Sequence, residues 1–224
     1  MWIDTNKYNE IVKDLTARNI TLVAVSKTKP VEAIQELYDL GHRDFGENYV
    51  QEMIDKESKL PKDIRWHFIG HLQTNKVKYI APFVHLIHGV DSWKLVTEIN
   101  KQGGKLDKHI SLLLQMHIAD EETKYGMNEA EVNSLIADLA DHPQHYIRIK
   151  GLMGMGSFTD DTEKTRVEFK KLKFLFDKLQ KLRTSNLSFE ILSMGMSGDY
   201  MIAAEEGSNM VRIGSLLFGN RQYQ

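Results

Sequence analysis

Short apolar runs alternate with longer amphipathic stretches along this chain. Each run is apolar at nearly every position, which is typical of a strand covered on both faces. The longer stretches carry apolar residues at helical spacing. The predicted strands cover residues 21–26, 44–47, 65–70, 85–90, 110–117, 147–153, 189–193 and 210–214. The clearest predicted helices cover residues 3–18, 92–103, 128–141, 161–183 and 197–207.

This alternation predicts a parallel α/β fold. Dividing 224 residues among eight strand–helix units leaves 28 residues for each, close to a minimal repeat. We therefore expect a (β/α)₈ TIM barrel with an extra N-terminal helix before the first strand. An open doubly wound sheet is the alternative. No linker or change of composition interrupts residues 1–224, so a single domain is expected.

The composition excludes several classes of function. The chain has no cysteine, which rules out a disulfide framework, a thiolate metal site and a cysteine nucleophile. Its 29 basic and 31 acidic residues are nearly balanced, so charge gives no reason to expect nucleic acid or an anionic membrane as a partner. No apolar stretch is long enough for a signal peptide or a membrane span, and a cytoplasmic protein is expected.

Histidine spacing gives little support for a metal site. His67 and His71 lie four residues apart, but on a predicted strand and in the loop after it. His85 and His88 lie three residues apart and are expected on opposite sides of a strand. Because the sequence suggests no third ligand, no bound metal is expected.

Candidate chemistry is sought at the carboxyl ends of the strands, where barrels of this kind carry their functional residues. Lys27 directly follows the first apolar run. An amine there could point into the barrel mouth, where a lowered pKa would let it attack a carbonyl group. It could equally be a loop lysine that only makes the strand end soluble, and its position alone does not decide between the two.

Two glycine- and serine-bearing segments follow the seventh and eighth predicted strands. The first spans residues 193–199 and contains Gly195, Ser197 and Gly198, with Ser197 a natural N-cap for the next helix. The second contains Gly214 and Ser215. Phosphate sites recur at these two loops of the barrel, so phosphate binding is favoured over a simple capped turn. Neither segment matches a phosphate-binding Walker loop, and residues 151–156 lack the dinucleotide spacing.

An amine and a phosphate site at one barrel mouth together suggest one small ligand. Pyridoxal 5′-phosphate (PLP) has an aldehyde for the lysine and a phosphate for the glycine loops. Its ring nitrogen also needs a partner, for which Arg212 on the last predicted strand is a candidate.

At these positions the chain resembles the YggS/PROSC family of pyridoxal-phosphate homeostasis proteins, which share the barrel of the alanine racemase N-terminal domain (fold type III). The resemblance extends from Val25 to Arg221, nearly the whole chain. The matching segments are residues 25–30, 45–52, 66–73 with Asn75 and Lys76, 151–153, 192–197 with Asp199, and 212–214 with Phe218, Gly219 and Arg221.

The resemblance implies a role for each candidate residue. Lys27 would be the lysine that forms a Schiff base with PLP. Asn48 would lie close to the cofactor, and Arg212 beside the pyridine ring. The implied phosphate contacts are Ser197, Gly214 and Ser215, with backbone amides supplying much of the binding.

One position departs from the family pattern. The family usually has an asparagine seven residues before the lysine of its ExxKxG segment. Here Glu121, Lys124 and Gly126 fit that segment, but the earlier position is His117. This puts polar packing around the fifth strand in doubt, but not the lysine–phosphate core.

The same resemblance favours a cofactor-binding protein over an enzyme. Related racemases take a second base, a tyrosine, from an additional β domain of a partner subunit, whereas this chain ends five residues after Gly219. An arginine beside the pyridine nitrogen disfavours protonation of the ring, which weakens the ring as an electron sink. An open barrel mouth would also leave the Schiff base wet.

We therefore expect intracellular homeostasis of vitamin B6, in which PLP is buffered or delivered. Apo PLP-dependent enzymes are expected as transient partners. A monomer is expected, because the racemase-type dimer contacts would be missing. The alternative function is that of a PLP-dependent amino-acid racemase or decarboxylase.

Overall fold

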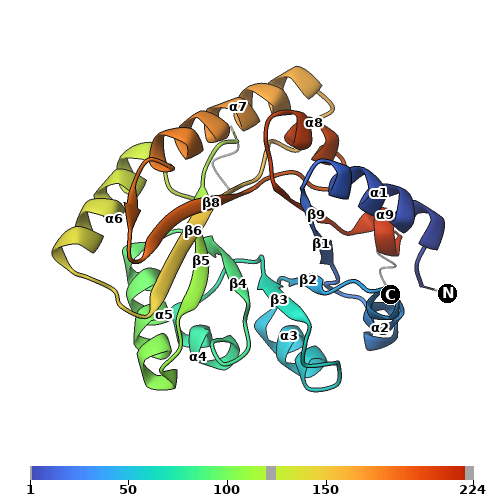
Figure 1. Cartoon of the computed structure of the whole chain (residues 1–224), viewed down its shortest axis with the longest axis horizontal. Coiled ribbons are helices and arrows are strands. Elements are labelled where there is room, and N and C mark those ends of the chain that lie inside the picture. Colours follow the sequence, from blue (N-terminus) through green and yellow to red (C-terminus); the bar gives the residue numbers. More distant parts are fainter. Residues whose placement is uncertain (1, 120–124, 220–224) are drawn as a thin grey trace.

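A computed structural model describes residues 2–119 and 125–219, which form a closed barrel of eight parallel strands (Figure 1). Each strand pairs in parallel with its neighbour, and pairing between β6 and β8 closes the ring. The predicted barrel is therefore confirmed, and the alternative of an open doubly wound sheet is wrong. The strands are β1 (Thr21–Val25), β2 (Asp44–Glu47), β3 (Arg65–Phe68), β4 (Leu86–Val90), β5 (Ile110–Met116), β6 (Ile147–Gly154), β8 (Leu187–Ser193) and β9 (Met210–Ile213).

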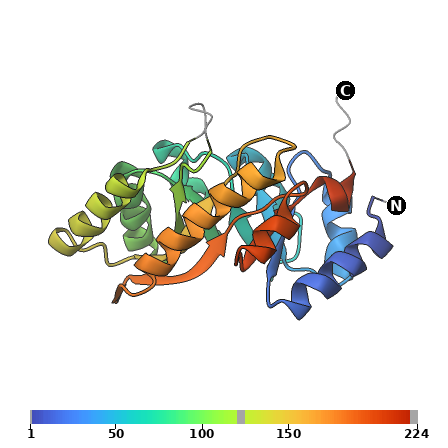
Figure 2. The same ribbon diagram turned by 90° about the horizontal axis from the view of Figure 1, so that it is seen from above.

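Helices cover the outside of the barrel (Figure 2). The extra N-terminal helix is confirmed as α1, which packs against β1 and α9. None of the helices within the described ranges is long and apolar enough to cross a membrane. The helices are α1 (Thr5–Ala17), α2 (Val31–Asp39), α3 (Val50–Glu57), α4 (Val77–Ile80), α5 (Trp93–Leu106), α6 (Glu129–Asp141), α7 (Thr162–Leu179), α8 (Tyr200–Glu205) and α9 (Ser215–Phe218), with a 3₁₀ turn at Thr74–Lys76.

Apolar side chains fill two layers, one between strands and helices and one inside the barrel. The inner layer contains Val23, Leu86, Leu113, Met153 and Met210, all buried. Because side chains alternate between the two faces of a strand, Val25 at the end of β1 points to the same side as Val23. The direction of β1 therefore aims its last residues toward the barrel mouth.

The chain departs from the predicted elements after α7. That helix ends at Leu179 instead of continuing to residue 183. A short strand β7 (Arg183–Thr184) follows and pairs antiparallel with the start of β8. The Thr184 hydroxyl donates a hydrogen bond to the Asn186 side chain at 2.8 Å within the turn. The hairpin overrides the helical pattern, and it starts β8 two residues earlier than predicted.

Candidate functional site

Lys27 lies directly beyond β1, in a half-buried position at the carboxyl end of the barrel. Thr28, the next residue, has φ +62°, which turns the chain sharply away from the strand. The Thr28 amide donates a hydrogen bond to the Glu52 carboxylate at 2.5 Å, and this bond holds the turn. The strand and the turn thus fix the point from which the Lys27 side chain leaves.

A buried ion pair supports this strand end from outside the barrel. The Lys56 ammonium donates to Glu47 Oε1 at 2.7 Å, to Glu52 at 2.7 Å and to the Ser26 carbonyl at 2.8 Å. The Ser26 hydroxyl donates to the same Glu47 oxygen at 2.6 Å. Burial raises the pKa of Glu47 to about 7, although the charge of Lys56 opposes this shift. The residue before Lys27 is therefore held through both its hydroxyl and its carbonyl group.

The end of β9 packs closely against the end of β1. A Cβ atom added to Gly214 would lie 3.2 Å from the Val25 carbonyl oxygen, so a larger residue there would press on β1. The Lys29 ammonium donates to the carbonyls of Phe218 at 2.8 Å and Gly219 at 3.3 Å. These contacts bring the loop that carries Lys27 beside the segment of Gly214 and Ser215.

The loop after β8 also meets this segment. The Gly214 amide donates to the Ser197 hydroxyl at 3.2 Å. The prediction that Ser197 caps the next helix is wrong, because α8 begins only at Tyr200, with Asp199 at the N-cap position. The Asp199 carboxylate accepts a hydrogen bond from the Met196 amide at 2.5 Å and so closes a turn before the helix begins. Ser197 is thereby joined to Gly214 instead of to α8.

Gly195 gives this loop its shape, and an alanine there should destabilise the fold. Its φ is +97°, and an added Cβ atom would lie 2.5 Å from the Ala203 Cβ atom. For Gly195→Ala we expect a loss of about 1–3 kcal/mol in the free energy of unfolding. Gly198→Ala in the same loop is the matched control, because a Cβ atom there meets nothing within 4 Å. Urea denaturation measures both, and equal stabilities of the two variants would contradict the prediction.

Arg212 lies inside the barrel, level with Val23 on the neighbouring strand and thus deeper than Lys27. It is 4 % exposed. Its guanidinium donates to the Ser193 hydroxyl at 2.6 Å and to the Gly154 carbonyl at 3.0 Å. Burial lowers the pKa of Arg212 to about 10, so the group is still a cation at neutral pH.

Asn48 follows β2, the strand beside β1, and carries an unsatisfied polar atom. Its side-chain oxygen is buried and has no hydrogen-bond partner among the described residues. Gly70 is needed beside it, because a Cβ atom there would lie 2.3 Å from the Asn48 carbonyl oxygen. A buried oxygen without a donor is costly, which makes Asn48 a candidate to bind a ligand.

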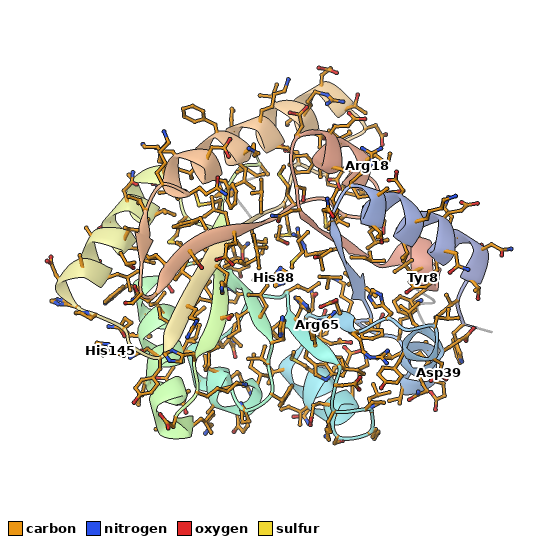
Figure 3. All side chains as sticks on the ribbon, viewed as in Figure 1. Tyr8, Arg18, Asp39, Arg65, His88 and His145 are labelled. Atoms are coloured by element: carbon orange, nitrogen blue, oxygen red, sulfur yellow. The ribbon has the colours of Figure 1, made fainter. Side chains whose placement is uncertain are left out.

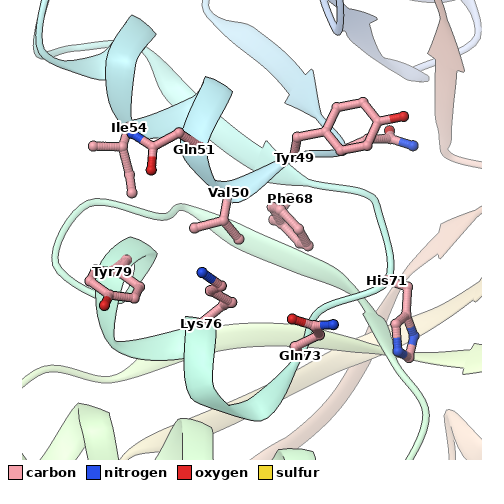
Figure 4. Close-up of a pocket in the computed structure, with 10 residues that line it drawn as sticks. Tyr49, Val50, Gln51, Ile54, Phe68, His71, Gln73, Lys76 and Tyr79 are labelled. Carbon is pink, nitrogen blue, oxygen red and sulfur yellow. The ribbon is translucent and has the colours of Figure 1, made fainter.

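A cavity of about 420 Å³ opens next to Asn48. It lies between α3 and the segment of α4, and Figure 4 shows Val50, Phe68 and Lys76 around it. Lys27, Ser197 and Arg212 do not line it. The cavity therefore borders the site predicted from the sequence without including its charged residues.

The structure describes some of the remaining candidate residues but not all of them. The backbone contacts bring Ser197, Gly214 and Ser215 beside the loop of Lys27. His117 is half-buried after β5, and its amide donates to the Met127 carbonyl at 3.0 Å. Glu121, Lys124 and Arg221 lie outside the described residues.

The histidines are arranged differently from the prediction. His85 and His88 do not take opposite sides, because β4 begins only at Leu86 and both rings lie near His67, at centroid distances of 5.4 and 5.2 Å. His71 instead stacks on Tyr125. No group of three side chains able to hold a metal ion occurs within residues 2–119 and 125–219. The contact between His67 and His88 was missed, since no sequence spacing signals a pair formed across two strands.

Comparison with known proteins places the chain in a family. Residues 5–222 match the model of the alanine racemase N-terminal domain. A pyridoxal phosphate homeostasis protein of Aquifex aeolicus is 42% identical over 203 residues, which cover 90% of this chain and 87% of the relative. The pyridoxal phosphate homeostasis protein of Escherichia coli is 39% identical over 91% of this chain and 87% of its own length.

Solved structures agree with this placement. PipY of Synechococcus elongatus without PLP superposes with a TM-score of 0.88 at 33% identity, covering 96% of this chain and 99% of PipY. Its structure with PLP bound gives a TM-score of 0.84 over 94% of this chain and 99% of PipY, also at 33% identity. An alanine racemase of Clostridium difficile, at 19% identity and a TM-score of 0.75 over 97% of this chain and 56% of the racemase, shares the fold. The chain belongs to the alanine racemase N-terminal domain family, together with the pyridoxal phosphate homeostasis proteins.

Proposed function

We propose that this protein binds PLP at the carboxyl end of the barrel and serves in vitamin B6 homeostasis. The observation that carries the proposal is the close packing of Gly214 on Val25, which sets the loop of Lys27 beside the loops of Ser197 and Ser215. The relatives that share its sequence are named for pyridoxal phosphate homeostasis, and PipY has been solved with PLP bound.

The described residues fit each part of the cofactor. Lys27 would hold the aldehyde carbon as a Schiff base, with one water molecule released. Ser197, Ser215 and Gly214, whose amide donates to the Ser197 hydroxyl in this structure, would hold the phosphate. Arg212 would face the ring nitrogen, and the unsatisfied oxygen of Asn48 would accept a hydrogen bond from the ligand or its water. Bound PLP supplies a reversible electrophile and an electron-accepting ring.

A storage or delivery role agrees better with Arg212 than a catalytic role. With a pKa of about 10, the Arg212 guanidinium stays positive at neutral pH. A cation at the ring nitrogen opposes protonation there, and an unprotonated ring withdraws electrons less strongly. The homeostasis names of the relatives are consistent with this role. A PLP-dependent racemase or decarboxylase is the alternative that the following experiment addresses.

The experiment has two parts, both on the full chain. Titration with PLP is expected to give saturable binding with one equivalent and a visible absorption band. The loaded protein is then incubated with single L-amino acids in deuterated water, and mass spectrometry follows exchange of the α-proton. Little exchange beyond that caused by free PLP is expected. Absence of binding would refute the site, and rapid turnover would refute the storage role.

We further propose that the barrel acts as a cytoplasmic monomer that passes PLP to apo PLP-dependent enzymes. One reversible covalent site suffices for buffering and for delivery. A transfer assay separates the two: an apo-enzyme is activated by the loaded protein or by free PLP at equal concentration. Faster activation by the loaded protein supports delivery, and activation that only follows the free PLP concentration supports buffering.

A further inference from the structure

A chain of buried hydrogen bonds leads from Arg212 across the inside of the barrel. Its guanidinium lies 2.6 Å from the Ser193 hydroxyl, which lies 3.2 Å from His88 Nδ1. His88 Nε2 lies 3.0 Å from His67 Nδ1, and His67 Nε2 lies 3.0 Å from the Asp44 carboxylate. The chain thus joins β9, β8, β4, β3 and β2.

The far end of this chain lies at the opposite mouth of the barrel. There Arg65 donates two hydrogen bonds to Asp44, at 2.7 and 2.5 Å. A cavity of about 340 Å³ at the amino ends of the strands is lined by these two residues together with His67, His85 and Lys150, among others. Figure 3 shows Arg65 and His88 within the ring of strands. This chain of hydrogen bonds therefore connects the proposed cofactor site with a second opening of the barrel.

The middle of the chain is sealed from solvent. Ser193 and His88 are 0 % exposed, and His67 is 1 % exposed. Burial and the neighbouring charges lower the pKa of His88 well below its ordinary value. Hydrogen bonds from Arg65 and His67 outweigh burial and hold the pKa of Asp44 below its ordinary value. The charged ends are thus Arg212 on one side and the Asp44–Arg65 pair on the other, with the neutral His88 ring and the His67 ring between them.

The charged groups at the two ends of this hydrogen-bond chain limit where each of its protons can lie. Arginine can only donate, so the Ser193 oxygen accepts from Arg212, and its own proton is available for His88 Nδ1. His88 must then carry its proton on Nε2, which donates to His67 Nδ1. His67 in turn carries its proton on Nε2 and donates to Asp44, which as a carboxylate only accepts. For two neutral rings, this is the one arrangement that gives each contact a donor and an acceptor.

We infer that Ser193, His88 and His67 are positioning residues for Arg212, locked in a single proton arrangement by Asp44 at the opposite mouth. In this arrangement the Ser193 hydroxyl proton is committed to His88, which fixes how the Ser193 oxygen faces Arg212. A change at Asp44 would reach the proposed ring-nitrogen partner through four consecutive bonds, without any contact with the cofactor. The effect on PLP rests on the proposed function, whereas the proton arrangement does not.

The proton arrangement is tested on the cofactor-free full chain by long-range ¹H–¹⁵N NMR of its histidine rings. His67→Gln and His88→Gln spectra assign the two signals. Both rings are expected to carry the proton on Nε2, and His88 is expected to stay neutral from about pH 6 to 8. A proton on Nδ1 of either ring, or a His88 that titrates in this range, would overturn the inference. This measurement needs no PLP, and the protonation states are read from the unaltered chain.

The link to the cofactor is tested with Asp44→Asn and Ser193→Ala. An asparagine amide can donate to His67, which releases the lock, so a mixed His67 tautomer and weaker PLP binding are expected. Ser193→Ala removes a partner of a charged group, for which a loss of about tenfold in PLP affinity and a shifted absorption band are expected. Lys150→Gln is the control, since Lys150 lines the same mouth but pairs with Glu190 at 3.2 Å.

The outcomes separate the two proposals. If the unaltered protein binds no PLP, the proposed function fails while the NMR result still decides the proton arrangement. If PLP binds but both variants keep the affinity and absorption band of the Lys150→Gln control, the positioning role fails and the proposed function stands. A tautomer change in Asp44→Asn together with a shifted band supports the inference.

Discussion

Replacing Lys27 by alanine is expected to abolish covalent binding of PLP while leaving the barrel folded. Lys27 is half-buried beyond the end of β1, so truncation removes an amine without opening a cavity in the core. The neighbouring Ser26 stays fixed through its contacts with Glu47 and Lys56. The phosphate contacts would remain in this variant. We therefore expect it to bind PLP weakly and reversibly, without the visible absorption band.

Reduction with borohydride followed by peptide mapping measures this directly. In the unaltered protein the pyridoxyl group should appear on the peptide that contains Lys27. In Lys27→Ala the label should be lost, while circular dichroism and the free energy of unfolding should stay unchanged. Lys76→Ala is the control, because Lys76 lines the adjacent cavity as an exposed lysine. Stoichiometric label on another lysine of the unaltered protein would remove Lys27 from its proposed role.

Much of the barrel could be predicted because its strands are buried on both faces. A run such as that of β5, whose residues are nearly all buried, stands out from any amphipathic helix. The order of the strands then follows from the right-handed connections of parallel units. The β7–β8 hairpin was missed, because a two-residue strand leaves no period to detect and its turn follows directly on a helical pattern.

In the candidate site, too, some residues could be predicted from the sequence and others could not. Lys27 and Gly214 could be predicted because each lies beside a strand end, where the fold alone brings residues together. The chain from Ser193 to Asp44 could not, since its members lie on four strands and look like ordinary polar residues within apolar runs. Their meeting depends on the register around the closed barrel, which residue spacing does not encode.

The Glu47–Lys56 ion pair also depends on how the chain packs, which residue spacing does not encode. Breaking this pair is expected to lower the stability of the fold strongly. Lys56→Met leaves the Glu47 carboxylate buried without its cation, with one oxygen that already has no hydrogen-bond partner among the described residues. A loss of about 3–5 kcal/mol in the free energy of unfolding is expected. Lys62→Met is the control: it removes an equally short ion pair with Glu57 in which the lysine is 68 % exposed, so a change below about 1 kcal/mol is expected.

The loss in Lys56→Met should depend on pH in a definite direction. The pKa of Glu47 in the folded protein is about 7, above its ordinary value of 4.5. The folded state therefore binds this proton more tightly than the unfolded state. The resulting stabilisation is fully present below pH 4.5 and is lost as the pH rises through 7. Without Lys56 the pKa of Glu47 rises further, because the opposing positive charge is gone. Up to about pH 7 both proteins then lose stability in parallel, whereas above it only the variant continues to lose stability. The deficit measured by urea denaturation should therefore be larger at pH 8.5 than at pH 6.

The double variant Glu47→Gln, Lys56→Met distinguishes an ionic cause from a simple loss of packing. A neutral glutamine can still accept the hydrogen bond from the Ser26 hydroxyl, and it leaves no charge buried. Most of the lost stability should therefore return, and the deficit should no longer grow as the pH rises. A double variant as unstable as Lys56→Met at every pH would show that the methylene packing of Lys56, and not its charge, holds the end of β1 on which Lys27 depends.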